Sequence, residues 1–315
     1  MQLKDLFILC LLLFVKTAPA QVVYPYPLQS FPLTIEDQKV QMVYMDVKPA
    51  IPNGHTIILF HGKNFSSYYW KDIIPALTEK GYRVIVPDQV GWGRSDKPEL
   101  HYSFQMLAKN NRLLLDFLHI EKVTVIGHSM GGMLAVRFAL MFAGRTEKLV
   151  LENPIGLEDY KTFVPSKTPA ELYRKEKAAT YESYKEYQQS YYPVWKPEYE
   201  QYVQAQAEIL ADPDFDRIAK VNAATYQMIY DQPVVYELQR ITMPTLLIIG
   251  QADRTIVGKD LLTEEQKNLH GQYPQLGKKA QQQVHNSQLI ELPGIGHIPH
   301  IQDADAFKKA LFDFL

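Results

Sequence analysis

The chain has 315 residues, of which 46% are hydrophobic, and its formal net charge is −2. This length and composition indicate a globular chain with a sizeable core, organised as one large domain or as one domain with an insertion. Binding to nucleic-acid phosphates requires a basic surface. The near-neutral charge, without a long run of one sign, therefore argues against a nucleic-acid partner.

The N-terminus has the pattern of a bacterial secretory signal. The apolar run 6–15 is shorter than the roughly 20 residues that a membrane-spanning helix needs. Residues 18–20 (Ala-Pro-Ala) match a cleavage site, so we expect a signal peptide at 1–20 and a mature chain that begins at Gln21. The alternative is an N-terminal membrane anchor. The only cysteine, Cys10, lies in this segment. We therefore expect an exported, periplasmic or secreted protein without disulfides, and without stable membrane insertion once the signal is removed.

Downstream, segments typical of strands alternate with segments typical of helices. We expect strands at 40–47, 56–60, 82–86, 123–126, 148–151, 245–249 and 288–292. Helices are expected at 69–80, 104–118, 130–142 and 304–315. The first strand alternates loosely and should be antiparallel, whereas most later strands are short, continuous apolar runs that indicate burial on both faces. The pattern predicts an α/β fold with a mostly parallel central sheet and helices on both faces.

The interval 154–243 interrupts this alternation and has the pattern of several amphipathic helices without a buried strand. Eleven of the twenty tyrosines lie between Tyr173 and Tyr236. We therefore predict a helical cap at 154–243, inserted into a core domain made of 21–153 and 244–315. The tyrosines pack within this insertion, or line a substrate cleft beneath it, and the two uses are compatible.

Ser129 lies in a G-x-S-x-G motif, directly after a buried strand and before a helix. A serine hydroxyl is a weak nucleophile, so it must be exposed on a sharp strand-to-helix turn beside a base. Gly127 and Gly131 let neighbouring backbone pass where a Cβ would clash. Ser129 is the candidate nucleophile, and the backbone amide of Met130 is the candidate donor to an oxyanion.

Two further strand ends supply a base and an acid. Ligands of open α/β sheets bind at the carboxyl ends of the strands. His297 follows the last strand in a glycine-rich loop and is the candidate base, with His300 as the alternative. Asp253 follows the strand 245–249 and is the candidate acid, with Glu152 as the alternative. No third ligand has suitable spacing for a metal, and we expect neither a metal nor a cofactor.

The segment 61–64 (His-Gly-Lys-Asn) directly follows the strand 56–60. A glycine in second place lets this loop turn toward Ser129. The backbone amide of Lys63 is therefore the candidate second oxyanion donor. The side chain of Lys63, by contrast, is expected to be that of an ordinary solvated lysine.

The order Ser129, Asp253, His297 around a strand–elbow–helix resembles the α/β-hydrolase superfamily over essentially the whole mature chain. The loop 61–64 and the turn 91–95 (Gly-Trp-Gly-Arg-Ser) match as well. The resemblance is to the capped branch, which includes epoxide hydrolases, haloalkane dehalogenases, C–C bond hydrolases, cofactor-free haloperoxidases and small-molecule esterases. Epoxide hydrolases and dehalogenases carry aspartate at the elbow. Proline iminopeptidases and C–C hydrolases usually have a different first loop.

The resemblance therefore implies a serine hydrolase that cleaves a small-molecule carboxylic ester through an acyl-enzyme on Ser129. The alternatives on the same triad are a C–C bond hydrolase, a lactonase and a cofactor-free perhydrolase. A ligand-binding protein that retains the triad is the non-enzymatic alternative, because a fold does not determine a function. The acyl and alcohol groups depend on cap geometry, and these motifs specify neither them nor the oligomeric state.

Overall fold

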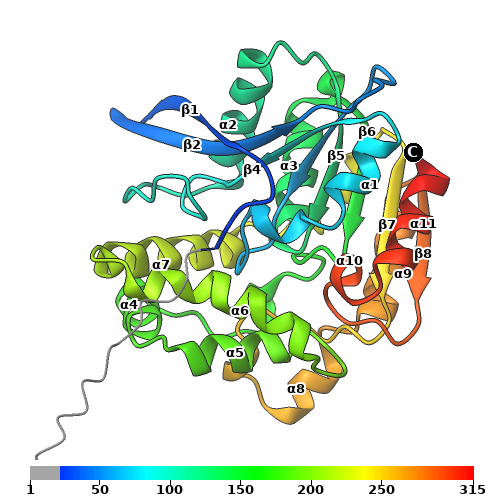
Figure 1. The fold of residues 1–315 in the computed structure, drawn as a ribbon. Helices are drawn as coiled ribbons and strands as arrows, with labels where there is room; N and C mark the ends of the chain where they lie inside the picture. The colour runs from blue at the N-terminus through cyan, green and yellow to red at the C-terminus, as the bar shows by residue number, and fades with distance from the viewer. Residues whose placement is uncertain (1–21) are drawn as a thin grey trace, which may run out of the picture.

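An eight-stranded sheet forms the centre of the molecule, and its neighbouring strands follow the order β1-β2-β4-β3-β5-β6-β7-β8 (Figure 1). The computed structural model describes residues 22–315, so the predicted signal peptide at 1–20 and Cys10 lie outside the described residues. The strands are β1 (Leu28–Ile35), β2 (Gln38–Val47), β3 (Thr56–Phe60), β4 (Arg83–Pro87), β5 (Val123–His128), β6 (Thr146–Glu152), β7 (Thr245–Gly250) and β8 (Ser287–Leu292). β2 pairs antiparallel with β1 and β4, and all pairs from β4 to β8 are parallel. The predicted α/β class with a mostly parallel sheet is confirmed.

The sequence patterns predicted seven of these strands to within two residues at either end, but not β1. Only the second half of β1 alternates between buried and exposed residues. Pro32 also lies inside it. Proline lacks the backbone N–H and is tolerated mainly in edge strands, and β1 is indeed the edge strand beside β2.

Side chains along the strands alternate between two hydrophobic layers. Leu149 and Leu151 of β6 belong to the layer that contains α2 (Phe104–Phe117), α3 (Met130–Met141) and α9 (Tyr273–Gln283). Val150 belongs to the opposite layer, with α1 (Ile74–Glu79) and α11 (Ala304–Phe314). The sheet is therefore covered on both faces, as its continuous apolar strands predict.

The predicted helix at 69–80 is shorter than expected. A 3₁₀ turn spans Ser67–Trp70, and α1 begins only at Ile74, with Pro75 in its first turn. Proline is favoured there because its missing N–H is not needed and its fixed φ suits a helix start. The helices α8 (Glu264–Leu269), α9 and α10 (Pro299–Gln302) were not predicted.

Between β6 and β7 the chain forms α4 (Pro169–Lys177), α5 (Tyr181–Gln189), α6 (Glu200–Ala207) and α7 (Phe215–Asp231), joined by turns and short 3₁₀ helices. These helices gather beyond one end of the sheet, below it in the view of Figure 1. α4 and α5 begin with capping boxes at Thr168 and Thr180, which satisfy amides that a helix start leaves unpaired. We call residues 154–243 the helical segment. Its behaviour as a separate cap domain stays a prediction.

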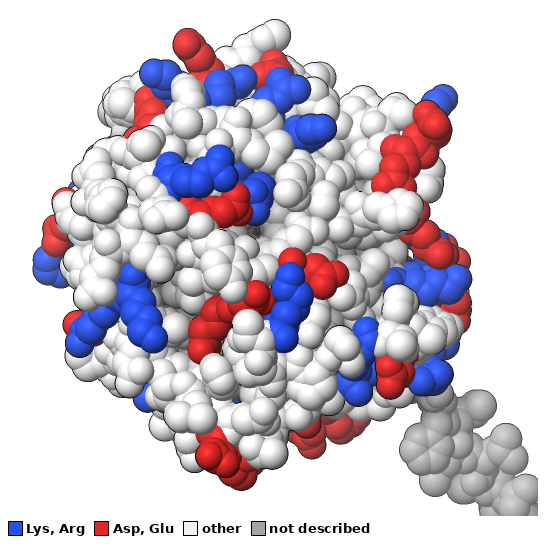
Figure 2. All heavy atoms as spheres, turned by 180° about the vertical axis from the view of Figure 1, so that it is seen from behind, with Lys and Arg blue, Asp and Glu red and all other residues white. Residues whose placement is uncertain are grey.

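Charged side chains of both signs are interspersed on the face that Figure 2 shows, without a large area of one sign. No helix within residues 22–315 combines the length and the hydrophobicity needed to cross a membrane.

Candidate active site

Three strand ends bring Ser129, Asp253 and His297 together. Ser129 directly follows β5, and the other two residues lie just beyond β7 and β8. His297 Nε2 is 2.9 Å from Ser129 Oγ, and His297 Nδ1 is 2.7 Å from Asp253 Oδ2. The side chains of His297 and Asp253 are each 1% exposed. The structure therefore places the three predicted residues in a single hydrogen-bonded line, as a nucleophile, a base and an acid would require.

The backbone at Ser129 is strained. Its φ is 56° and its ψ is −120°, a conformation that residues other than glycine rarely adopt. The Ser129 amide donates to the Glu152 carbonyl oxygen at 3.1 Å, and the Ser129 carbonyl oxygen accepts from the Gly132 amide at 2.9 Å. This turn presents Ser129 at the N-terminus of α3, where the helix dipole favours negative charge.

Glycines allow the elbow to pack against the neighbouring strand. A Cβ on Gly131 would lie 2.2 Å from the Phe60 carbonyl oxygen, a distance that no real contact reaches. We expect Gly131→Ala to displace the start of α3 and to lower the free energy of unfolding by about 1–3 kcal/mol. Chemical denaturation measures this loss. Gly144→Ala is the matched control, because a Cβ there would meet no atom within 4 Å. Equal losses in the two variants would contradict the role of close packing.

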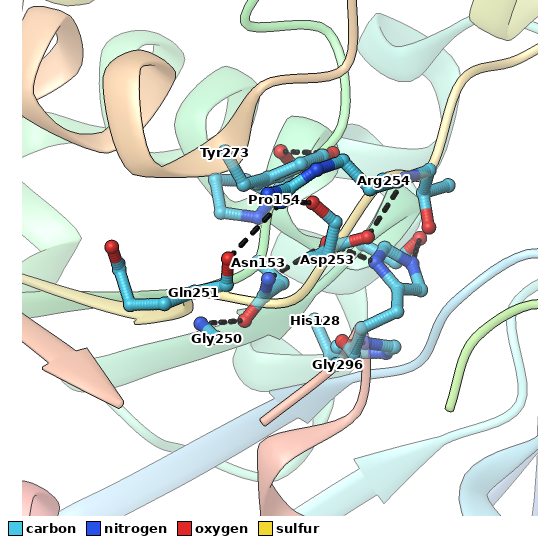
Figure 3. A network of polar contacts seen from close by, with 12 residues as sticks. His128, Asn153, Pro154, Gly250, Gln251, Asp253, Arg254, Tyr273 and Gly296 are labelled. Atoms are coloured by element: carbon cyan, nitrogen blue, oxygen red, sulfur yellow. Dashed lines mark hydrogen bonds and ion pairs between the residues drawn. The ribbon is translucent and has the colours of Figure 1, made fainter. Parts of the chain in front are cut away.

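Asp253 accepts hydrogen bonds from other residues besides His297. Asn153 Nδ2 donates to Oδ2 at 2.7 Å, and the Thr255 amide donates to Oδ1 at 2.8 Å. Figure 3 shows Asn153 bridging Gly250 and Asp253. Burial alone would raise the pKa of Asp253, but the charge of His297 and these hydrogen bonds outweigh it and hold the pKa below its usual value. The side chain is therefore an ionised acceptor for the imidazole.

Sequence reasoning missed Asn153. This residue follows β6 with a positive φ of 37° and is fully buried. The only signal in the sequence is a polar residue at the carboxyl end of a buried strand, which many loops also have.

The two alternative residues, Glu152 and His300, pair with each other. The His300 amide and Nδ1 lie 2.7 and 2.9 Å from Glu152 Oε1. Burial favours the neutral form of each group: it raises the pKa of Glu152 to about 7 and lowers that of His300 to about 3. The Trp70 ring stacks on the His300 ring with centroids 4.2 Å apart. Within residues 22–315, neither of the two side chains hydrogen-bonds to the Ser129 or His297 side chain.

The loop after β3 lies against the elbow. A Cβ on Gly62 would be 3.3 Å from Ser129 Cβ, so the backbone of Lys63 passes close to the serine. Trp92 Nε1 donates to the Lys63 carbonyl oxygen at 2.7 Å and holds this loop in place. Among the described residues, the amides of Lys63 and Met130 have no hydrogen-bond acceptor. They are available to an oxyanion, and that role stays a prediction.

The side chain of Lys63 differs from the solvated lysine that was expected. It is only 19% exposed, and its Nζ lies 3.9 Å from Glu176 Oε1 on α4. The ammonium group therefore sits in the cleft and pairs with the helical segment. This ion pair forms only when two distant segments of the chain pack together, and no local sequence pattern predicts such packing.

A buried chain of hydrogen bonds connects the loop after β3 to His297. The Gly62 amide donates to the Tyr69 hydroxyl at 2.9 Å, the Tyr69 hydroxyl lies 3.1 Å from His128 Nδ1, and His128 Nε2 lies 2.8 Å from the His297 carbonyl oxygen. A carbonyl oxygen can only accept, so His128 carries its proton on Nε2 and Tyr69 donates to Nδ1. Burial lowers the pKa of His128 well below its usual value, which keeps this ring neutral.

Ser129 opens into a cleft of about 600 Å³ that the helical segment covers from one side. This volume is within the range of small-molecule sites. The tyrosines of the helical segment that line the cleft are Tyr184, Tyr187, Tyr191, Tyr202 and Tyr226. Five of the eleven tyrosines thus face the cleft, and others pack in the interior, so both expected uses occur.

Comparisons with known proteins agree with this architecture. A family profile described as alpha/beta hydrolase fold matches residues 55–174. The crystal structure of a probable hydrolytic enzyme from Pseudomonas aeruginosa PAO1 superposes with a TM-score of 0.92 and 44% sequence identity, over 95% of this chain and 99% of that one. The chain therefore belongs to the α/β-hydrolase superfamily.

Curated relatives match shorter segments. An uncharacterised protein of Mycobacterium tuberculosis is 39% identical over 105 residues, which are 33% of this chain and 30% of the relative. A 2-hydroxy-6-oxononadienedioate/2-hydroxy-6-oxononatrienedioate hydrolase of Paraburkholderia xenovorans is 38% identical over 136 residues, which are 42% of this chain and 46% of the relative. The matches thus span less than half the length of these relatives.

Proposed function

We propose that this protein is a serine hydrolase that cleaves a carboxylic ester of a small molecule through an acyl-enzyme on Ser129. The observation that carries the proposal is the hydrogen-bonded line from Ser129 Oγ through His297 to Asp253, in which Ser129 lines a cleft of small-molecule size. The strained elbow at Ser129 and membership of the α/β-hydrolase superfamily support it.

In the acylation step, Ser129 Oγ attacks the ester carbonyl carbon while His297 Nε2 takes the hydroxyl proton. The carbonyl oxygen gains the negative charge and accepts hydrogen bonds from the amides of Lys63 and Met130. His297 then gives its proton to the departing alkoxide, and the alcohol leaves. Asp253 remains ionised, accepts from His297 Nδ1 and stabilises the imidazolium that forms.

Deacylation repeats these roles with water. His297 removes a proton from a water molecule, and the hydroxide oxygen attacks the acyl carbon of the ester on Ser129. When the second tetrahedral intermediate collapses, Ser129 recovers its proton from His297 and the carboxylic acid is released. The net reaction consumes one ester and one water and yields one acid and one alcohol.

The cleft favours acyl and alcohol groups of modest size. Its helical wall supplies aromatic rings with polar edges, and charged groups pair across it, with Arg94 Nη2 only 2.9 Å from Glu208. A cleft of about 600 Å³ suits a small ester better than a polymer chain. C–C bond hydrolysis on the same residues is the second candidate, because a curated relative is a hydrolase of a 2-hydroxy-6-oxo acid.

A labelling and substrate experiment tests the proposal. A fluorophosphonate probe should form one covalent adduct, at Ser129, which peptide mass spectrometry locates. p-Nitrophenyl esters of short acids should give a higher kcat/KM than esters of long acids or emulsified triglycerides. A preference for the emulsion, with activation at the oil–water interface, would instead make the protein a lipase. Labelling at Ser129 without hydrolysis of any ester would favour the C–C hydrolase, which a 2-hydroxy-6-oxodienoate substrate then tests.

A further inference from the structure

Tyr191 connects the helical segment to two parts of the site. It lies in the turn after α5, and its ring stacks on the ring of His297 with centroids 4.8 Å apart and an angle of 28° between the planes. Its hydroxyl oxygen accepts a hydrogen bond from Asn64 Nδ2 at 2.8 Å. Its backbone carbonyl oxygen accepts from the His297 amide at 2.8 Å. One residue of the helical segment therefore contacts both the base and the loop after β3.

These contacts complete the support of His297. Its ring nitrogens face Asp253 and Ser129, and its carbonyl oxygen accepts from His128. Tyr191 accepts a hydrogen bond from the backbone amide of His297 and covers one face of its imidazole. Without Tyr191 the histidine would keep its hydrogen bonds within the sheet domain but lose its partner from the helical segment.

The fit between the two segments is close. A Cβ on Gly296 would lie 2.2 Å from the Tyr191 carbonyl oxygen, so the glycine before the base is required by the approach of this turn. Tyr191 is 7% exposed and also lines the cleft. Asn64 follows Lys63, whose amide is a candidate oxyanion donor. A shift of the Tyr191 ring would therefore disturb the base and the oxyanion loop together.

We propose that Tyr191 is a positioning residue of the hydrolase, through which the helical segment aligns both the base and the oxyanion loop. This inference rests on the proposed function of Ser129. Tyr191 acts through His297 and Asn64, and the chemistry remains that of the three aligned side chains. Misalignment of reacting groups by about 1 Å can lower a rate 100-fold. Loss of Tyr191 should therefore lower kcat much more than it raises KM, since most of the cleft wall remains.

The test separates the two side-chain contacts of Tyr191, because every substitution keeps the backbone carbonyl that accepts from the His297 amide. Tyr191→Leu removes the ring stack and the hydroxyl, and should lower kcat about 100-fold with little change in KM. Tyr191→Phe keeps the stack and should recover most of that loss. Tyr191→Phe and Asn64→Ala each break the same hydrogen bond, so the double variant should be no slower than the slower single variant. Thermal unfolding is measured for each variant.

Tyr173→Phe is the matched control. It also removes a tyrosine hydroxyl bond of the helical segment, to Asp216 Oδ1 at 2.6 Å, but this bond is exposed to solvent and Tyr173 does not line the cleft. Its kcat should not change. The proposal would be overturned if Tyr191→Leu raised KM and left kcat unchanged. It would also be overturned if Tyr173→Phe lost as much kcat as Tyr191→Leu at an equal loss of melting temperature.

The rate of fluorophosphonate labelling is a second readout, because it reports activation of Ser129 without requiring ester turnover. Tyr191→Leu should lower the rate of this labelling by at least the same factor by which it lowers kcat. If the wild-type protein labels at Ser129 but hydrolyses no ester, the ester function fails and the labelling rates still decide the role of Tyr191. Unchanged labelling in Tyr191→Leu would refute that role even if ester hydrolysis is established.

Discussion

Ser129→Ala is expected to lower kcat on the best ester on the order of 10⁶-fold, because without the hydroxyl no acyl-enzyme forms and only binding and oxyanion stabilisation remain. The fold should persist. Alanine keeps the Cβ of serine, so the strained φ of 56° is no harder to adopt, and the change removes only the Oγ that bonds to His297.

Steady-state kinetics and circular dichroism check this expectation together. Ser30→Ala is the matched control, since Ser30 is an exposed residue of β1 whose hydroxyl bonds to Gln41. It should retain full activity. Substantial turnover by purified Ser129→Ala, with the probe attached to another residue, would place the nucleophile elsewhere.

Asp253→Asn is expected to lower kcat by about 10⁴-fold, the loss typical of a triad without its carboxylate. Two donors, from Asn153 and Thr255, already face this side chain. An asparagine offers only one acceptor oxygen, so its NH₂ group faces either the Thr255 amide or the pair of donors at Oδ2, which are Asn153 Nδ2 and His297 Nδ1. In both orientations the negative charge that stabilises the imidazolium is lost. In the second orientation His297 also loses the acceptor that selects its tautomer.

Glu152→Gln is the matched comparison, because it makes the same change in the alternative acid. Glu152 bonds to His300, and burial already raises its pKa to about 7, so an uncharged amide of the same shape should cause only a mild loss of kcat. Melting temperatures of both variants control for unfolding. If Glu152→Gln proved the more severe, the acid of the triad would lie on β6.

Much of this protein was predictable from local patterns. The parallel strands are continuous apolar runs, and the loops that follow β5, β7 and β8 carry polar groups with the chemistry of a nucleophile, an acid and a base. In a parallel sheet the carboxyl ends of the strands share one edge, so Ser129, Asp253 and His297 were expected at the same edge once the sheet was predicted. Elements with weak local signals, such as β1 and α9, were missed.

The fold class, the elbow and the residues eligible for each role follow from the amino-acid pattern alone. The pairing of acids with histidines is apparent only in the folded molecule, where Asp253 faces His297 and Glu152 faces His300. The contacts that support these residues could not be predicted from the sequence either, because they join residues that are far apart in the chain. Asn153 and Asp253 are 100 residues apart, and Asn64 and Tyr191 are 127 apart. Local sequence patterns indicate the backbone conformation that a segment prefers. Contacts between distant residues depend instead on the strand order and on the way the helical segment packs against the sheet, and the packing of the whole chain determines both.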